Sequence, residues 1–182
     1  MALSATIRKV ELQINDLDRH HYASHSLTLA QHPSETDERL VARLLAFVLY
    51  AHERLEFGRG LSAEDEPDLW RRDYTGQIEQ WIDLGQPDEN RLRKAAGRAS
   101  EVVVVNYGGH AAEVWWHKQG VALRRMKQLT VIDLPHDVVS TLASHVQRTM
   151  RLDVLIQDGE VQIMGDALQL VLVPGVRHAP QA

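Results

Sequence analysis

Glu79 and Asp83 are the acidic residues whose spacing most clearly suggests chemistry. They lie within residues 77–85 (QIEQWIDLG), where the alternation of side chains predicts a β-strand. Residues two apart in a strand point to the same face, so Glu79, Trp81 and Asp83 are expected to share one. The opposite face carries the apolar residues Ile78, Ile82 and Leu84. The strand is therefore predicted to present two carboxylates on one face, separated by an indole ring.

A preceding strand, predicted over residues 68–73, adds two further carboxylates under one pairing register. In that register, the turn at residues 74–76 sets Trp70 opposite Glu79. Glu66 and Asp68 then come onto the same face as Asp83. A slip of one residue would turn every side chain of the strand to the other face. Under the first register, four carboxylates converge: Glu66, Asp68, Glu79 and Asp83.

Carboxylates that converge repel one another, and the repulsion raises their pKa values unless a cation or a proton relieves it. Mg²⁺, with Mn²⁺ as a substitute, prefers oxygen ligands and is held by one or two carboxylates, water and a phosphate oxygen. Such an ion polarises a phosphoryl oxygen and activates a bound water. The cluster predicts a Mg²⁺ site built from Glu66, Asp68, Glu79 and Asp83. The alternative is a solvated sheet face whose acids pair with Arg71 or Arg72.

The helix predicted after this strand offers cations. Arg91, Lys94 and Arg98 are spaced to share one helical face. Lys94 is the predicted catalytic cation, because a lysine beside a metal-bound phosphodiester stabilises developing negative charge. The alternative is a solvated basic face, or ion-pair partners for the strand acids.

The elements that position these residues follow from the periodicity of the apolar side chains. Strands are expected at residues 5–14, 26–30, 55–57, 68–73, 77–85, 101–107 and 129–134, and in a three-stranded meander over residues 151–174. Helices are expected after Ser34, which with Asp37 resembles a capping box, and over residues 88–100, 111–118 and 137–148. The predicted fold class is α/β (α+β), a mixed β-sheet flanked by helices, in a single domain of residues 1–182.

The bulk composition limits the function classes. The chain has no cysteine, which excludes disulfides and thiolate chemistry and suits a reducing cytoplasm. It has no segment typical of a signal peptide and no apolar run long enough to cross a bilayer, so we expect a cytoplasmic protein without a membrane partner. The net charge of −5 argues against coating nucleic acid by bulk charge, but not against gripping a phosphate locally through a metal.

Histidines and tryptophans give weaker signals. His21 and His25 are four positions apart, but no third ligand accompanies them, and surface histidines are the expected interpretation. Trp115 and Trp116 are adjacent in a predicted helix and cannot share a face, so one of them is expected in the core.

Several blocks along the chain resemble one family. They are DLDR (16–19), SLTLAQHPSETDER (26–39), HERLEFGRGL (52–61), DEP (65–67) with Trp70, WIDLGQPDENRLRKA (81–95), VWWHKQ (114–119), RTM (148–150) and IQDG (156–159). In this order they cover nearly the whole chain and resemble the YaeQ family of small bacterial proteins. The resemblance implies a restriction-endonuclease-like roll, a divergent form of the PD-(D/E)xK nuclease core.

The nuclease motif maps onto the acidic segment with one departure. Pro67-Asp68 resembles the PD pair, and Glu79 or Asp83 resembles the acidic residue on the next strand. The lysine expected two positions later is absent, because Trp81 and Gly85 occupy those positions. Lys94 on the following helix is a substitute that could reach the site from another backbone position.

Three functions follow from these observations. The first is a Mg²⁺-dependent phosphodiesterase acting on nucleic acid, with Asp68, Glu79 and Asp83 holding the metal and Lys94 assisting. The second is an inactive nuclease-like scaffold that binds nucleic acid or a protein of transcription or repair. The third is an interaction protein with an acidic surface patch. The two carboxylates on one face favour the first, and the missing lysine favours the other two.

Overall fold

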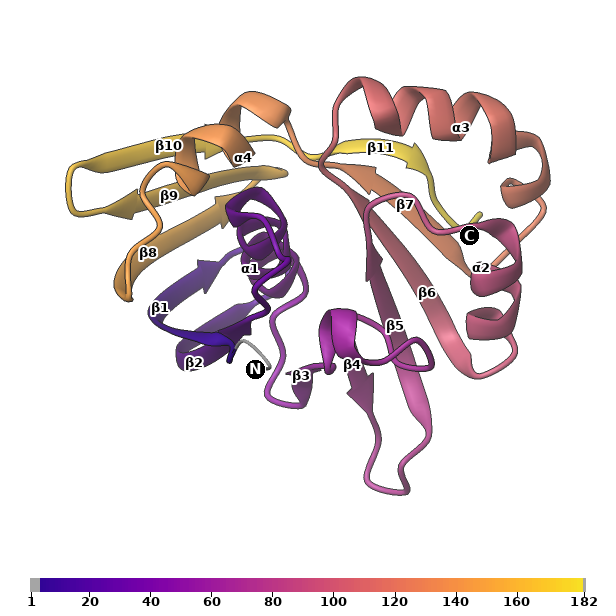
Figure 1. Ribbon diagram of the computed structural model, residues 1–182, viewed down its shortest axis with the longest axis horizontal. Coiled ribbons are helices and arrows are strands. Elements are labelled where there is room, and N and C mark those ends of the chain that lie inside the picture. Colours follow the sequence, from indigo (N-terminus) through magenta and orange to yellow (C-terminus); the bar gives the residue numbers. More distant parts are fainter. Residues whose placement is uncertain (1–3, 182) are drawn as a thin grey trace. The chain divides into compact units, whose positions relative to one another are not determined.

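The structure, a computed structural model, describes residues 4–181, which divide into two compact units. The first unit comprises the chain up to Ala51 together with Asp137–Pro174. The second comprises His52–His136 together with the C-terminal segment from Gly175. Each unit is built around its own β-sheet (Figure 1).

The sheet of the first unit has the strand order β10-β9-β8-β1-β2. Its strands are β1 (Thr6–Asp16), β2 (His21–Gln31), β8 (Thr149–Gln157), β9 (Glu160–Gly165) and β10 (Leu168–Leu172). β1 and β2 form an antiparallel hairpin, and β8 runs parallel to β1. The expected C-terminal meander is confirmed as β8, β9 and β10. Asp158 and Gly159 both have positive φ (53° and 77°), as the tight turn between β8 and β9 requires.

Helix α1 (Asp37–Tyr50) supplies the main apolar stripe of the first unit. The residues expected on its inner face, Leu40, Leu44, Phe47 and Val48, are buried. The expected capping box at Ser34 is wrong. Thr36 is the N-cap, accepting the backbone N–H of Arg39 at 3.2 Å, while the hydroxyl of Ser34 contacts the ring of His32. A shorter helix, α4 (His136–Ala143), ends five residues before Arg148, the end expected from the sequence.

The sheet of the second unit has the strand order β11-β7-β6-β5-β4-β3. Its strands are β3 (Leu55–Phe57), β4 (Leu69–Arg72), β5 (Ile78–Leu84), β6 (Ala99–Asn106), β7 (Leu129–Asp133) and β11 (Gly175–His178). β3, β4 and β5 are antiparallel, and β5, β6 and β7 are parallel. β11 was not expected from the sequence. The apolar run at Val102–Val105 is fully buried, as a strand covered on both faces requires.

Helices α2 (Glu89–Ala96) and α3 (His110–Leu123) pack on one face of this sheet, and a 3₁₀ turn, η1 (Gly60–Ser62), follows β3. The core beneath the helices contains Trp81 of β5, Leu92 of α2 and Trp115 of α3 together with valines of β6. α3 is longer than the predicted helix at residues 111–118. The expected mixed α/β class is therefore confirmed, with sheets that combine parallel and antiparallel pairs. No helix within residues 4–181 has the length and apolar character to span a bilayer.

Candidate functional site

The pairing of β4 with β5 decides which acidic residues meet. Trp70 lies opposite Trp81 and Leu69 opposite Ile82, so the expected pairing of Trp70 with Glu79 is wrong by two residues. The backbone N–H of Asp68 donates to the carbonyl of Ile82 at 3.0 Å, which places Asp68 beside Asp83. Because a shift of two residues preserves the faces of a strand, Asp68 and Asp83 still lie on the same side of the sheet.

A β-bulge removes Glu79 from that side. The register passes from Arg71 opposite Gln80 to Arg72 opposite Ile78, which leaves Glu79 without a cross-strand partner. Ile78 therefore joins Trp81 in the helix-covered core, although strict alternation would place them on opposite faces. The predicted common face of Glu79, Trp81 and Asp83 is wrong because of this extra residue.

Glu79 instead lies between two arginines. Its Oε2 accepts from Nη1 of Arg54 at 3.0 Å and from Nε of Arg71 at 2.9 Å. The hydrogen bond from Arg54 is the largest cause holding the pKa of Glu79 below its usual range, against a smaller opposing effect of burial. The alternative raised from the sequence, a strand acid paired with Arg71, describes Glu79 correctly.

Asp83 is buried and bound by Arg91 of α2. Nε and Nη2 of Arg91 donate to Oδ2 and Oδ1 of Asp83 at 2.8 and 3.0 Å, so one guanidinium satisfies both carboxylate oxygens. Only 1% of Asp83 is exposed. Burial is the largest influence on this carboxyl group and raises its pKa, the neighbouring Asp68 raises it further, and Arg91 opposes both.

Arg91 also ties the preceding loop to the site. Its Nη1 and Nη2 donate to the carbonyl oxygens of Glu64 and Glu66 at 2.6 and 2.9 Å. Hydrogen bonding to Asp83, in which Arg91 is the donor, raises the pKa of this guanidinium, which therefore stays charged. The sequence placed Arg91 on a basic stripe but did not single it out. Its position three residues after the N-cap Asp88 was the available signal, because the first turn of α2 follows directly after β5.

Asp68 and Glu66 have separate partners. Oδ2 of the buried Asp68 accepts the backbone N–H of Leu84 at 2.9 Å. Glu66 binds Arg59, whose Nη2 lies 3.0 Å from Oε1, and this hydrogen bond lowers the pKa of Glu66. The side chain of Glu66 is thus held by Arg59, and only its backbone carbonyl contacts Arg91.

Lys94 is exposed on α2, and its side chain takes part in none of the hydrogen bonds or ion pairs found within residues 4–181. Arg98, one turn further along, donates to the carbonyl of Asp65 at 2.8 Å and lies 5.0 Å over the ring of Trp81. The cation at the acidic pair is therefore Arg91 rather than Lys94.

These contacts do not suit the Mg²⁺ site predicted from the sequence. Of its four ligands, only Asp68 and Asp83 are brought together. Both oxygens of Asp83 already accept from Arg91, and Asp68 accepts from a backbone N–H. In the described part of the chain, no three His, Asp or Glu side chains are grouped so as to hold a metal ion.

His21 and His25 of β2 are paired head to head. Their Nε2 atoms are 2.9 Å apart and their ring centroids 5.2 Å apart, with the ring planes within 15° of each other. The two distances together place the nitrogens between the centroids, so the Nε2–H of one ring donates a hydrogen bond to the Nε2 of the other. His25 also meets the ring of Phe47 edge-on at 5.1 Å. The sequence predicted surface histidines and did not predict this contact. Both rings are partly buried within the first unit.

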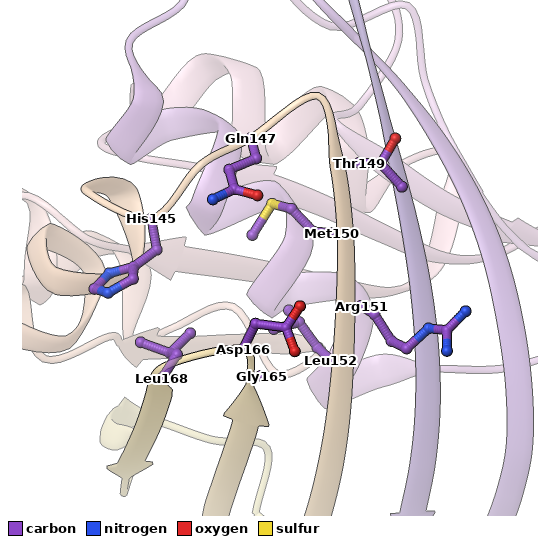
Figure 2. A pocket seen from close by; sticks show the side chains of 9 residues that line it. All are labelled: His145, Gln147, Thr149, Met150, Arg151, Leu152, Gly165, Asp166 and Leu168. Atoms are coloured by element: carbon purple, nitrogen blue, oxygen red, sulfur yellow. The ribbon is translucent and has the colours of Figure 1, made fainter.

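The first unit also has a small pocket beside the first residues of β8. Its volume is about 50 Å³, and its lining includes His145, Met150 and Asp166. Figure 2 shows Thr149 and Arg151 extending to the opposite side of the β8 ribbon from Met150. A volume of this size holds a few water molecules, whereas ligand pockets usually enclose hundreds of cubic ångströms. None of the acidic site residues predicted from the sequence lines it.

Comparison with known proteins identifies the family. The YaeQ protein family model matches residues 1–174. The chain belongs to the YaeQ family. The resemblance drawn from its sequence blocks is thereby confirmed.

YaeQ proteins of two enteric bacteria are similar along most of their length. The YaeQ protein of Salmonella typhi is 47% identical over 162 residues, which cover 88% of this chain and 89% of that protein. The YaeQ protein of Escherichia coli (strain K12) is 45% identical over 167 residues, which cover 91% and 92%.

Crystal structures of YaeQ proteins share the fold. The YaeQ protein from Xanthomonas axonopodis pv. citri is 61% identical, with a TM-score of 0.94 over 97% of this chain and 100% of that one. The YaeQ protein from Pseudomonas syringae is 36% identical, with a TM-score of 0.92 over 98% of each chain.

Proposed function

We propose that this YaeQ-family protein is a nuclease-like scaffold that binds nucleic acid without cleaving it. The observation that carries the proposal is the guanidinium of Arg91, which occupies both oxygens of Asp83. In a metal-dependent nuclease, the acidic residue of this strand presents its oxygens to a divalent ion. Here a side chain of the same chain takes the place of that ion.

The surrounding contacts support binding over hydrolysis. Asp68 accepts from the backbone of Leu84, and the position two residues after Asp83 is Gly85 instead of a lysine. A bidentate arginine–carboxylate pair is among the strongest charge-assisted contacts. With only 2% of the Asp83 side chain exposed, little water competes for it. The pair stabilises a fixed structure at the position where a nuclease needs open metal-coordinating oxygens.

The nucleic-acid part of the proposal rests on the order of elements. α1, the antiparallel strands β3, β4 and β5, α2 and the parallel strand β6 follow one another as in the nuclease core that the sequence resembles. On this proposal the scaffold keeps a nucleic-acid-binding surface although its acidic residues serve the fold. Because the chain has a net charge of −5, that surface has to be a local one.

A second candidate, the Mg²⁺-dependent phosphodiesterase, is favoured by the proximity of Asp68 and Asp83. Asp68 contributes to raising the pKa of Asp83, so the two carboxylates are close enough for their charges to interact. A metal at this position would have to displace Arg91 from both oxygens of Asp83.

One experiment separates the two functions. Labelled single-stranded DNA, duplex DNA and RNA are incubated with the full chain, with and without Mg²⁺ or Mn²⁺, and both binding and cleavage are measured. The proposal predicts binding that weakens with salt, with no cleavage and no calorimetric signal from millimolar Mg²⁺ alone. Asp83→Asn tests the acidic pair, and Asp153→Asn, at an exposed position of β8, is the matched control.

Metal-dependent cleavage that Asp83→Asn abolishes and Asp153→Asn leaves intact would establish the phosphodiesterase and refute the proposal. Absence of binding to all three nucleic acids would also refute it.

A further inference from the structure

The arginines and lysines of the second unit fall into two groups. Members of the first group each bind a carboxylate: Arg54, Arg59, Arg71, Arg72, Arg91, Arg93 and Arg177. Such pairs neutralise charge within the protein and leave little for a partner. The second group has no carboxylate partner within residues 4–181, and four of its members follow one another along α3 and the turn after it.

These four are Lys118, Arg124, Arg125 and Lys127, and together they form the α3 basic surface. All four are exposed. Between Glu113 and Asp133 the chain contains no acidic residue, so no local carboxylate opposes them. Lys118 lies within α3, Arg124 is its C-cap, and Arg125 and Lys127 lie in the turn that follows. A net acidic protein thus concentrates unneutralised positive charge on one segment.

The α3 basic surface has a fixed support. The guanidinium of Arg124 lies 5.0 Å over the ring of Trp116. The turn after α3 is held by Gln128, whose Nε2 donates to the carbonyls of Ala96 and Ala99 at 2.8 and 2.9 Å. Figure 1 shows α3 and α2 as neighbours within this unit, and the two helices contact one another. The cations are therefore presented by an ordered helix and turn.

Stabilisation of α3 explains only some of the four cations of the α3 basic surface. Cations near the C-terminus of a helix interact favourably with its dipole, which accounts for Arg124 and Arg125 at the end of α3. Lys118 lies in the interior of α3 (His110–Leu123), and Lys127 lies beyond its end. Neither is placed to serve the dipole of that last turn, so the charge requires another explanation.

We propose that the α3 basic surface is the docking site for the phosphate backbone of nucleic acid. This inference rests on the proposed function and names the surface that performs it. Cations spaced along a helix and the turn after it match the regular phosphates of a nucleic acid strand, and an arginine placed over an indole ring suits contact with sugar and base.

The apolar residues of α3 favour nucleic acid over a lipid surface. A helix that lies in a membrane interface buries tryptophan, phenylalanine or leucine among the lipid chains. Trp115 is buried with its Nε1 donating to the carbonyl of Pro87, and Trp116 is covered by Arg124. The exposed large apolar residues of α3 are Val114 and Val121, too small an area to anchor the helix.

The test compares two double variants of equal charge. Lys118→Gln/Arg125→Gln removes one lysine and one arginine from the α3 basic surface. Lys9→Gln/Arg148→Gln removes the same two residue types from exposed positions in the first unit. Binding of the full chain to labelled single-stranded and duplex DNA and to RNA is measured by anisotropy from 50 to 300 mM salt. Vesicles containing anionic lipid serve as the competing ligand. Thermal unfolding verifies that both variants are folded.

The α3 variant is expected to bind nucleic acid at least tenfold more weakly at 0.1 M salt. Its slope of log affinity against log salt should become shallower by about 1.4 for single strands and about 1.8 for duplex, from the loss of two phosphate contacts. The control variant should retain the affinity and slope of the wild type.

Several outcomes would overturn the inference. If the wild type binds nucleic acid and both double variants weaken it equally, or neither does, the α3 docking site is refuted and the proposed function stands. If the wild type binds none of the nucleic acids, both are refuted. If anionic vesicles bind at the α3 basic surface in preference to nucleic acid, the partner assigned here is wrong.

Discussion

Replacement of Arg91 by methionine would leave Asp83 buried without its cation. Methionine keeps an unbranched side chain of similar reach and favours helix, so α2 should persist. The substitution removes the two hydrogen bonds to Asp83, at 2.8 and 3.0 Å, and also those to the carbonyl oxygens of Glu64 and Glu66. The side chain of Asp83 is only 2% exposed, so water replaces little of what is lost.

The magnitude of this effect has a ceiling set by protonation. Removing one partner of a buried ion pair costs about 3–5 kcal/mol. A buried carboxyl group can escape that cost by taking up a proton. For a carboxyl group whose pKa in the unfolded chain is about 3.9, taking up the proton costs about 4 kcal/mol at pH 7 and about 1.5 kcal/mol at pH 5, at about 1.36 kcal/mol per pH unit. Since Arg91 is 31% exposed, we expect a loss of about 2–4 kcal/mol at pH 7.

The sign of the pH dependence follows from the same group. Burial already raises the pKa of Asp83, and removal of Arg91 removes an influence that lowers it. A carboxyl group whose folded pKa is raised destabilises the folded state above that pKa, and the penalty disappears as the pH falls towards the unfolded value. The part of the deficit of Arg91→Met that is due to Asp83 should therefore shrink to about 1.5 kcal/mol or less at pH 5, while the part due to the lost hydrogen bonds to the carbonyls of Glu64 and Glu66 stays the same.

Urea unfolding followed by tryptophan fluorescence measures this change. All four tryptophans, Trp70, Trp81, Trp115 and Trp116, belong to the second unit, so the signal reports the unit that contains Asp83. Arg93→Met on the same helix is the control, because its pair with Glu89 is largely exposed and should contribute little. The double variant Asp83→Asn/Arg91→Met should recover much of the loss. A deficit that is equal at pH 7 and pH 5 would refute the reasoning.

Two further predictions concern the backbone and the histidine pair. A Cβ on Gly58 would lie 2.0 Å from the carbonyl oxygen of Pro67, so Gly58→Ala should cost about 1–3 kcal/mol or more in urea unfolding. A Cβ on Gly97 would lie 3.5 Å from the carbonyl oxygen of Lys94, an ordinary contact distance, so Gly97→Ala should be neutral, and similar losses for both would contradict this explanation. Burial is the main cause lowering the pKa of His21 and of His25, so their contribution to stability is present above pH 6.5 and lost as the pH falls below it. The melting temperature of His21→Gln/His25→Gln should fall less between pH 7.5 and pH 5 than that of the wild type; an unchanged pH profile would exclude the pair as its source.

The local sequence pattern predicted helices and strands well where an apolar run or a turn motif was clear. The run at Val102–Val105 predicted a strand buried on both faces, and the Asp158-Gly159 turn predicted the meander. These features depend on residues close in sequence, so the pattern contains the information that specifies them. β11 was missed because its four residues have no clear periodicity and are ordered by pairing with β7.

The candidate site depended on information that the local pattern lacks. Alternation placed Glu79 with Asp83, but the bulge opposite Arg71 and Arg72 turned Glu79 towards Arg54 and Arg71. A bulge inserts one residue into one strand, and strict alternation cannot reveal where that residue lies. The sequence placed Arg91 and Lys94 on a shared helical face and favoured Lys94, and only the packing of α2 against β5 selected Arg91.

The sequence by itself determined the family, the mixed α/β class and the meander, and it predicted the proximity of Asp68 to Asp83 under one of the pairing registers that it allowed. The proximity survived a register error because an even shift keeps strand faces unchanged. Tertiary structure alone decided that Arg91 would hold Asp83, that Glu79 would lie between two arginines, and that Glu66 would bind Arg59. Each of these outcomes depends on which side chains from distant segments reach one carboxylate, and that is settled by packing and by the cost of leaving a buried charge without a partner.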